Sequence, residues 1–385
     1  MLKLSIALIS VVSILDQGIA IAMLTALLIS YARKKEEINI SEERNINFLI
    51  LAVFLSFLSF FLPKGVVFAA IFSSLAHKLK GGVFKNLFFY TVFGFPFFFY
   101  YYNTISTSIF IALSGAIAAS LVESVQSRVD KQFTVLLALT TAYVIFTIYV
   151  PDASIFDLIL ALTISLLLSY LAMRMKIADE SGLLAATLCG LIVILFSDFL
   201  HFIVLLLFFS LGSAVTKYKY QLKMQLGIAE EAGGARGYAN VLGNSLPALF
   251  FAMNTYYGEI FSAAFVSSVA CALADTMASE IGKTAKKVYL ITNFKRVKPG
   301  TSGGISFIGE LAALLGCFLT FLVSFALNIV DFDLLIVFAA FVGVHVDSLL
   351  GATLEKKNLL TNSVVNLLAT LSAGATYLAL KIAIQ

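Results

Sequence analysis

The sequence predicts an all-α polytopic membrane protein, a transmembrane helix bundle of about 14 spans (12–14). Of its 385 residues, 60% are hydrophobic and 12% are charged, compared with roughly 45–50% and about 25% in average soluble domains. The apolar residues form runs separated by short polar breaks, and a run of about 20 residues is long enough to cross a bilayer. The chain therefore buries its apolar surface in lipid, and a soluble enzyme is excluded.

Each predicted span is an apolar run bounded by polar or turn-forming residues. Several runs are shorter than the roughly 20 residues that a straight crossing needs. In chain order, the spans cover residues 3–31, 46–62, 66–78, 84–101, 104–123, 132–150, 154–173, 182–197, 199–214, 245–256, 259–282, 308–329, 332–351 and 362–383.

The distribution of basic residues orients the bundle. If the chain crosses the membrane at every span, only Lys3, Lys64 and Lys381 of the 26 Lys and Arg residues fall on one side. Because cytoplasmic loops are enriched in Lys and Arg, the other side is cytoplasmic, and both termini are predicted to lie outside. Two long, glycine-rich and charged loops, about 215–244 and 283–307, place the expected chemistry on the cytoplasmic face.

Polar residues are distributed unevenly along the chain. Residues 1–150 contain little beyond the charges that flank spans, whereas 175–366 carry nearly every dense polar cluster. We therefore predict an N-terminal transmembrane helical region, 1–150, and a second domain, 151–385, that carries the activity.

The first polar cluster runs from the end of a span at Gly212–Lys217 to a glycine-rich stretch around Arg236. Glycines beside an arginine let backbone N–H groups and the guanidinium approach an anion closely. Asn240 and Asn244 follow on the same stretch. Taken alone, this segment is better explained as a solvated, positively charged cytoplasmic loop.

The second cluster closes an apolar helix with Asp275, Thr276, Ser279 and Glu280. Acids at such a position are costly unless they are paired or bind a metal. On a helix, Asp275 and Ser279 share one side, as do Thr276 and Glu280, so the group can present oxygen ligands to a hard cation. We favour this function over hydrogen bonding between helices.

The third cluster is a basic, glycine-rich turn, Lys295–Ser306, that leads into the span near 308–329. Such a turn at the start of a helix suits phosphate, because small residues allow close backbone approach and hydroxyls donate hydrogen bonds. We favour anion binding here over a flexible loop with flanking charges.

The fourth cluster adds an acid, Asp347, at another predicted cytoplasmic helix end. Asn362 and Asn366 follow with i,i+4 spacing, so they share a helix face and can bind phosphate, a base or a neighbouring helix. His77, His201 and His345 are scattered, and no transition-metal site is expected.

Together the clusters resemble a known family. They read Gly-Ser-Ala-x-Thr-Lys at 212–217, Gly-Gly-Ala-Arg at 233–236, Ala-Asp-Thr-x-Ala-Ser-Glu-Ile-Gly at 274–282, Pro-Gly-Thr-Ser-Gly-Gly-Ile-Ser at 299–306 and Asp-Ser-Leu-Leu-Gly-Ala-Thr at 347–353. This series is similar to that of the phytyl-phosphate kinase family, an integral-membrane group that includes the plant vitamin E pathway enzyme and the animal transmembrane-protein-19 proteins. The resemblance covers about residues 160–385.

Three positions depart from the family pattern. Met277 stands where the family usually has Trp, Asn240 where Gln is expected, and Glu355 where Gln is common. None of these departures removes a charge from the expected site.

The resemblance implies that 151–385 is a catalytic transmembrane domain of the phytyl-phosphate kinase type. Such an enzyme transfers the γ-phosphate of a nucleoside triphosphate, with CTP as the expected donor, to phytyl or geranylgeranyl phosphate and forms the diphosphate. This transfer mainly requires positioning and charge neutralisation, which Mg²⁺ on carboxylates can provide together with basic residues and a glycine-rich loop. The expected partners are a membrane lipid and a nucleotide, and no nucleic acid.

The resulting hypothesis gives each site residue a role. Asp275, Glu280 and Asp347 are expected to bind Mg²⁺, and Lys217 and Arg236 to act with them in catalysis. The predicted phosphate- and nucleotide-binding residues are Lys298, Gly300, Thr301, Ser302, Gly303, Gly304, Ser306, Asn240, Asn244, Asn362 and Asn366.

Two alternative functions remain open. A membrane transporter or lipid flippase would use intramembrane acids as ion or proton sites near the bilayer midplane, whereas Asp275, Glu280, Glu310 and Asp347 are all predicted near one face. A lipid-phosphate cytidylyltransferase would use similar parts, but it would release pyrophosphate instead of CDP.

Overall fold

The computed structural model describes residues 2–33, 40–78, 82–125 and 129–384. The chain divides into two compact units, Met1–Leu160 and Ala161–Gln385, and α8 (Ile155–Arg174) runs across the boundary. Among the described residues, nine helices are long and apolar enough to cross a membrane. The prediction of a polytopic, all-helical membrane protein is confirmed.

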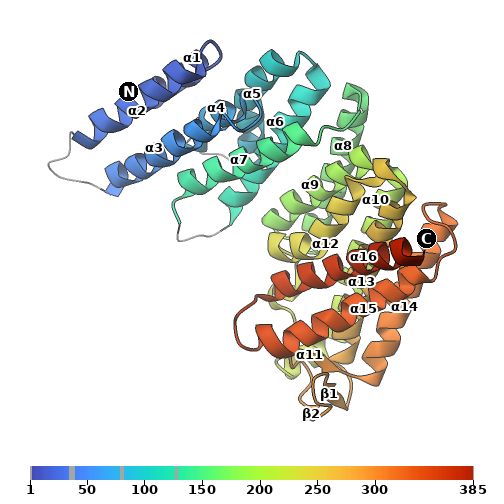
Figure 1. Ribbon diagram of the computed structural model, residues 1–385. Coiled ribbons are helices and arrows are strands. Elements are labelled where there is room, and N and C mark those ends of the chain that lie inside the picture. Colours follow the sequence, from blue (N-terminus) through green and yellow to red (C-terminus); the bar gives the residue numbers. More distant parts are fainter. Residues whose placement is uncertain (1, 34–39, 79–81, 126–128, 385) are drawn as a thin grey trace. The chain divides into compact units, whose positions relative to one another are not determined.

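Among the described residues of the first unit, helices are the only regular secondary structure (Figure 1). From α3 onward, its helices follow the predicted spans closely. Their bounds are α1 (Leu2–Val12), α2 (Gln17–Arg33), α3 (Ile40–Leu58), α4 (Val66–Ser74), the 3₁₀ helix η1 (Leu75–Lys78), α5 (Val83–Tyr102), α6 (Ile105–Ser124) and α7 (Lys131–Ile148).

The single span predicted over 3–31 is wrong. The chain turns between α1 and α2, which pack against each other as a hairpin (Figure 1). Asp16 explains the break, because its Oδ1 accepts a 2.9 Å hydrogen bond from the backbone N–H of Ile19 and so caps the start of α2.

This hairpin removes the basis for predicting an outer N-terminus. The Nζ of Lys3 donates a 3.1 Å hydrogen bond to the carbonyl of Leu75, which lies just before the predicted cytoplasmic loop 79–83. Lys3 thus contacts the end of the span predicted over 66–78, and the side on which the N-terminus lies stays a prediction.

A large aromatic side chain fills the centre of the first unit. Tyr143 on α7 is fully buried, and its hydroxyl lies 3.1 Å from Ser73 Oγ. Gly94 and Gly115 face the Tyr143 ring, which occupies the space that a Cβ at either position would need. Small residues thus let α4, α5, α6 and α7 pack around one ring.

One acid of the first unit is fully bound by neighbouring side chains. Glu123, at the end of α6, lies 2.5 Å from His77 Nδ1 and accepts hydrogen bonds from Asn86 at 2.5 Å and Tyr90 at 2.7 Å. These contacts join η1, α5 and α6 and satisfy a carboxylate that would be costly in a bilayer.

The second unit contains the remaining helices and a small sheet. Their bounds are α9 (Glu180–Phe196), α10 (Phe199–Lys217), α11 (Tyr220–Gln225), η2 (Glu231–Gly234), α12 (Tyr238–Ala252), η3 (Thr255–Tyr257), α13 (Glu259–Gly282), β1 (Val288–Leu290), β2 (Arg296–Val297), β3 (Gly304–Ile305), α14 (Phe307–Ala326), α15 (Leu335–Leu350), the π-helix η4 (Gly351–Glu355) and α16 (Asn362–Ile384).

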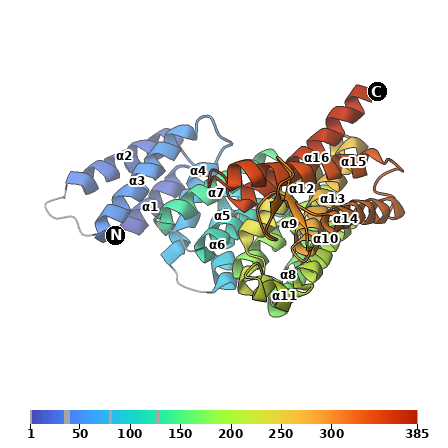
Figure 2. The same cartoon turned by 90° about the horizontal axis from the view of Figure 1, so that it is seen from below.

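Helix α13 is the centre of the second unit. It packs against α10, α12, α14, α15 and α16 (Figure 2), and every residue from Ser262 to Ala274 is buried. Most of these side chains are Ala, Ser or Val, so the surrounding backbones come close. For example, a Cβ at Gly316 of α14 would lie 2.8 Å from the Cα of Ala274. This packing fixes the polar end of α13 among its neighbours.

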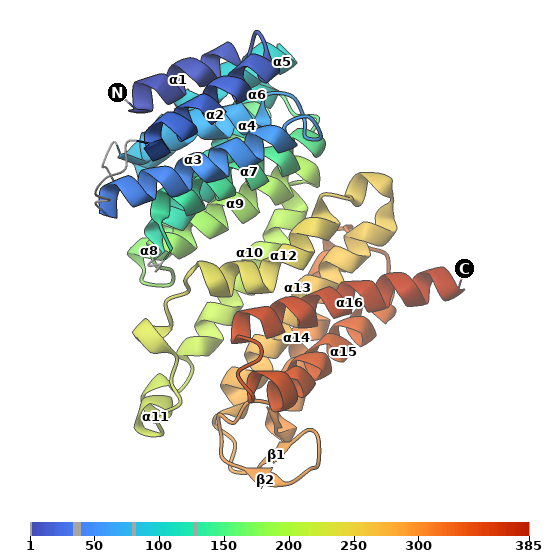
Figure 3. The same ribbon diagram turned by 60° about the vertical axis from the view of Figure 1, so that its left-hand side comes forward.

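The loop between α13 and α14 forms a three-stranded antiparallel sheet that the all-α prediction did not include. Its strand order is β2-β1-β3, with Val288 opposite Val297 and Leu290 opposite Gly304. Figure 3 shows this loop beyond the ends of α14 and α15. The sheet gives the glycine-rich turn 298–303 a fixed frame.

Candidate active site

A cavity of about 510 Å³ lies within the second unit, a size typical of small-molecule sites. It is formed by the polar end of α13, the last turns of α15, the first turns of α12, α14 and α16, and the turn 300–306. The predicted residues that line it are Arg236, Asn240, Asn244, Asp275, Glu280, Gly300, Thr301, Ser302, Gly303, Gly304, Ser306, Asp347, Asn362 and Asn366.

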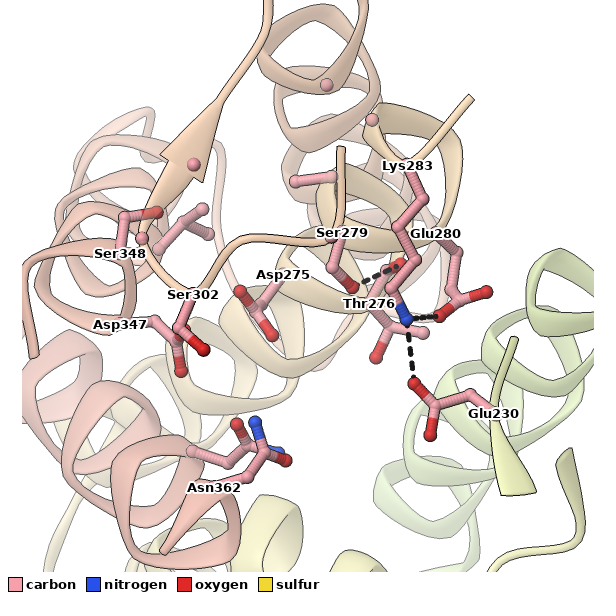
Figure 4. Close-up of a pocket in the computed structure, with 18 of the residues that line it drawn as sticks. Glu230, Asp275, Thr276, Ser279, Glu280, Lys283, Ser302, Asp347, Ser348 and Asn362 are labelled. Atoms are coloured by element: carbon pink, nitrogen blue, oxygen red, sulfur yellow. Dashed lines mark hydrogen bonds and ion pairs between the residues drawn. The ribbon is translucent and has the colours of Figure 1, made fainter. Parts of the chain in front are cut away.

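Two acids from different helices meet on one side of the cavity. Asp275 of α13 and Asp347 of α15 both line it, and their charges interact with each other and with that of Glu355. Figure 4 shows Asp275 between Asp347 and Ser302 on one side and the cluster around Lys283 on the other. The cavity therefore has an acidic side that also carries hydroxyls.

Asp347 is held by an amide network, but no basic side chain of the described ranges forms an ion pair with either acid. With its amide in the orientation that satisfies its neighbours, Asn366 donates to Asp347 Oδ2 at 3.2 Å and accepts from Asn244 Nδ2 at 3.1 Å. Like charges placed together in a half-buried site are costly without a cation. The acidic side is therefore suited to a cation.

Glu280 does not belong to the acidic side, contrary to the predicted three-carboxylate metal set. It is almost fully buried; its Oε2 binds Lys223, and its Oε1 lies 2.7 Å from Lys283 Nζ. Both oxygens are thus occupied by ammonium groups. Across the described part of the chain, no group of three His, Cys, Asp or Glu side chains is placed to share a metal.

Lys283 forms the second part of this ion network. Its Nζ also lies 2.8 Å from Oε1 of Glu230 (Figure 4). Burial acts to raise the pKa of Glu230, but the hydrogen bond and charge of Lys283 outweigh burial and hold that pKa below its ordinary value. For Lys283, burial acts to lower the pKa, but the charges and hydrogen bonds of Glu280 and Glu230 outweigh burial and raise that pKa above its ordinary value.

Arg236 is the cavity cation that lacks a carboxylate partner. Its side chain is buried, its guanidinium carbon lies 5.0 Å from the centre of the Phe208 ring, and its Nη1 has no hydrogen-bond partner. Burial lowers the pKa of Arg236 to about 10, against the opposing charges of Glu230 and Glu280, so the group stays charged at pH 7. A buried, unpaired guanidinium is costly and suits an anionic ligand.

Backbone contacts fix the position of Arg236. Its N–H donates to the carbonyl of Ile177 at 2.8 Å, and its carbonyl accepts from the N–H of Asp179 at 3.2 Å. The Asp179 carboxylate in turn caps α9 and accepts from Ser181 Oγ, which accepts from the N–H of Tyr238 at 3.0 Å. Residues at and just before the start of α9 thus fix the backbone of Arg236 itself and that of Tyr238, two residues later.

The glycine-rich turn approaches α15 closely. Gly303 has φ +74°, and a Cβ there would lie 2.5 Å from the carbonyl oxygen of Ser348. Ser306 ends the turn and caps α14, since its Oγ accepts from the N–H of Gly309 at 3.2 Å. Only glycine fits at position 303, and this contact puts the turn beside Asp347.

Two predicted basic residues lie outside the cavity. Lys217 and Lys298 are exposed and do not line it, so the catalytic role predicted for Lys217 and the phosphate-binding role predicted for Lys298 lose their geometric support. The cavity instead uses Lys283, which the site prediction omitted together with Glu230 and Glu355. Gly282-Lys283-Thr284 is similar to the end of a P-loop, but Met277 stands where that motif needs a glycine and a helix precedes it, so the local pattern does not predict the role of Lys283.

The acidic side fits Mg²⁺ better than a metal that prefers nitrogen or sulfur. Mg²⁺ is commonly held by one or two carboxylates and by substrate phosphates, and Asp275 and Asp347 supply two carboxylates beside the hydroxyls of Ser302 and Ser348. The donor set therefore agrees with the predicted ion, with Glu280 removed from its ligands.

Comparison with known proteins identifies the family. The chain matches the family described as integral membrane protein DUF92 over residues 163–374. The chain belongs to the DUF92 family. The match lies within the range 160–385 expected from the five clusters, and it contains the cavity, so the family resemblance drawn from the sequence is confirmed.

Several curated proteins are similar to part of the chain. An uncharacterized membrane protein of Methanocaldococcus jannaschii is 34% identical over 221 residues, which are 56% of this chain and 91% of that protein. Protein VTE6, chloroplastic, of Arabidopsis thaliana is 36% identical over 148 residues, 36% of this chain and 44% of that protein. Protein PGR of Arabidopsis thaliana is 31% identical over 230 residues, 52% of this chain and 80% of that protein. No solved structure matches the chain significantly.

Proposed function

We propose that the protein is a membrane-embedded phosphotransferase that moves the γ-phosphate of a nucleoside triphosphate, with CTP as the donor, to a prenyl monophosphate. An oxygen of the acceptor phosphate attacks the γ-phosphorus, the bond from that phosphorus to the β–γ bridging oxygen breaks, and the nucleoside diphosphate leaves. The products are a prenyl diphosphate and CDP.

One observation carries this proposal. A buried arginine whose Nη1 has no hydrogen-bond partner lines the same cavity as two acids that form no ion pair among the described residues. Phosphoryl transfer requires mainly positioning and neutralisation of phosphate charge, and these two elements are complementary to a phosphate that brings a divalent cation. The family resemblance, with its prenyl-phosphate substrates, supports the same reaction.

Each group of cavity residues would have its own role in this reaction. Asp275 and Asp347 would hold Mg²⁺, which supplies charge neutralisation on the phosphates when bound. Arg236 would bind phosphate oxygens through its guanidinium, and the turn 300–304 would bring backbone N–H groups close to them. The cytoplasmic location of this cavity follows from the charge distribution and is part of the proposal.

A substrate screen tests the reaction directly. Purified protein with Mg²⁺ is incubated with each of four nucleoside triphosphates and with phytyl, geranylgeranyl or farnesyl phosphate. Formation of prenyl diphosphate and CDP is expected. In Asp275→Asn and in Asp347→Asn, turnover should fall by about 100-fold or more, because each variant removes one of the two carboxylates that would hold the cation that neutralises the phosphates.

The matched control is Asp331→Asn, which removes an exposed carboxylate from the loop between α14 and α15, outside the cavity. It should keep its turnover. Wild-type turnover in both cavity variants would contradict the proposal. Release of pyrophosphate from doubly labelled CTP would instead identify cytidylyl transfer.

A further inference from the structure

The ammonium group of Lys283 contacts two carboxylates, only one of which is also neutralised by another cation. Its Nζ lies 2.7 Å from Glu280 Oε1 and 2.8 Å from Glu230 Oε1. Glu280 is already neutralised by Lys223, which is completely buried and also donates to the carbonyl of Thr216 at 2.6 Å. The buried Glu280–Lys223 ion pair is therefore neutral by itself, and the carboxylate of Glu230 is the one that balances the charge of Lys283.

The two carboxylates differ in how firmly they are held. The Glu280 side chain is 3% exposed on the central helix, whereas the Glu230 side chain is 50% exposed. Glu230 belongs to the strap, defined here as residues 226–234, which connects α11 to the Arg236 turn. The Glu230 carboxylate is thus the member of the network that can leave without breaking the helix packing.

The backbone of the strap has the conformational freedom for such a displacement. Gly227 and Gly233 have φ +68° and +70°, and nothing lies within 4 Å of the position that a Cβ would take at either residue. The strap is tied to α11 by a 2.8 Å hydrogen bond from the Tyr220 hydroxyl to the carbonyl of Glu230. The site around Glu230 can therefore open on one side while its anchor on α11 remains.

The Glu230 carboxylate shares the cavity with a second cation, Arg236. Glu230, Lys283 and Arg236 all line the cavity, and the charge of Glu230 acts on both cations. Removal of this carboxylate would leave one ammonium and one guanidinium facing the same space. Two such cations suit an anion that carries more than one charge.

Resting on the proposed function, we propose that Glu230 occupies, in the ligand-free protein, the place of a phosphate group of the ligand. Lys283 and Arg236 form a diphosphate-binding subsite, and the strap withdraws Glu230 when a diphosphate or triphosphate enters. Glu230 is therefore an internal competitor that weakens binding of the anion.

Binding of inorganic pyrophosphate tests this subsite without any lipid or phosphoryl transfer. The full-length protein in detergent is titrated by calorimetry. Glu230→Gln should tighten pyrophosphate binding by about 2- to 5-fold, since a half-exposed ion pair is modest in strength. Lys283→Gln should weaken binding and should abolish the gain from Glu230→Gln in the double variant.

Two further variants serve as a charge control and as a replacement in case Lys283→Gln does not fold. Glu259→Gln removes one negative charge at the exposed start of α13, outside the cavity lining, and should leave pyrophosphate binding unchanged. If Lys283→Gln unfolds, Lys283→Met, which also removes the charge but keeps an apolar side chain, replaces it in the cycle. Unchanged or weaker binding in Glu230→Gln, or no pyrophosphate binding at all, would overturn the inference. A failure of the kinase proposal alone would appear as absent phosphoryl transfer with this binding pattern intact.

Discussion

Arg236 is the residue at which function and stability are expected to conflict. Arg236→Met keeps an extended apolar stem against Phe208 and removes a buried charge whose Nη1 has no partner. Replacing an uncompensated charge by an apolar group of similar length is often neutral or stabilising. We expect the thermal midpoint of the ligand-free variant to stay the same or rise, while the stabilisation by added pyrophosphate disappears.

Thermal unfolding with and without pyrophosphate measures both effects. Lys217→Met is the control, because it removes an exposed cation at the end of α10 that does not line the cavity. It should respond to pyrophosphate as the wild type does. A strong loss of stability in Arg236→Met would show that the arginine has a structural role.

The sequence could predict which residue types gather in the cavity, but not which cations enter it. Asp275, Asp347 and Arg236 stand out because polar residues at helix ends and among glycines are uncommon in an apolar chain. Lys217 is the last residue of α10 and Lys283 directly follows α13, and only the tertiary fold turns one into solvent and the other toward Glu280. Side-chain direction at a helix end depends on its neighbours, which the local pattern does not contain.

The glycine-rich turn is the element on which the shape of the cavity depends. Gly303→Ala places a Cβ at φ +74° and 2.5 Å from the Ser348 carbonyl oxygen. We expect the turn to shift away from α15, with a loss of about 1–3 kcal/mol in stability and a marked fall in transfer activity. Limited proteolysis of the loop and the transfer assay measure these effects.

Gly227→Ala separates the two causes of the stability loss in Gly303→Ala, which are backbone strain and the clash with the Ser348 carbonyl. Gly227 has a similar φ of +68°, but nothing lies within 4 Å of its Cβ position. It therefore reproduces the backbone strain without the clash. An equal loss of stability in both variants would assign that loss to strain alone and would contradict the importance of close approach to α15.

Most of the long helices of this protein were predictable because they are separate apolar runs, as α13 and α16 illustrate. Two features were not. The hairpin of α1 and α2 lies within one continuous apolar run, and only the Asp16 cap reveals the turn. The strands β1, β2 and β3 have two or three residues each, too few for an alternating pattern to form.

At the scale of the whole molecule, the second unit is expected to act alone. The family match covers residues 163–374, and the archaeal relative is covered over 91% of its length by the aligned segment. A fragment of residues 151–385 keeps α8 whole and contains every residue that lines the cavity. We expect it to insert into membranes and to bind pyrophosphate with an affinity close to that of the full chain.

Expression in membranes followed by titration of the purified fragment checks this expectation. The same fragment carrying Arg236→Met is the control and should not bind. A fragment that is folded by thermal unfolding but fails to bind would assign residues 1–150 a part in forming the site.

The unpaired charges of the cavity have a practical consequence for anyone who prepares this protein. Sulfate, citrate and phosphate buffers all carry multivalent anions that can settle on Arg236, and a chelator would strip any cation from Asp275 and Asp347. The choice of purification buffer therefore decides whether the cavity is empty or already holds a buffer anion when an assay begins. A sample handled in chloride and a zwitterionic buffer gives the fairest first test.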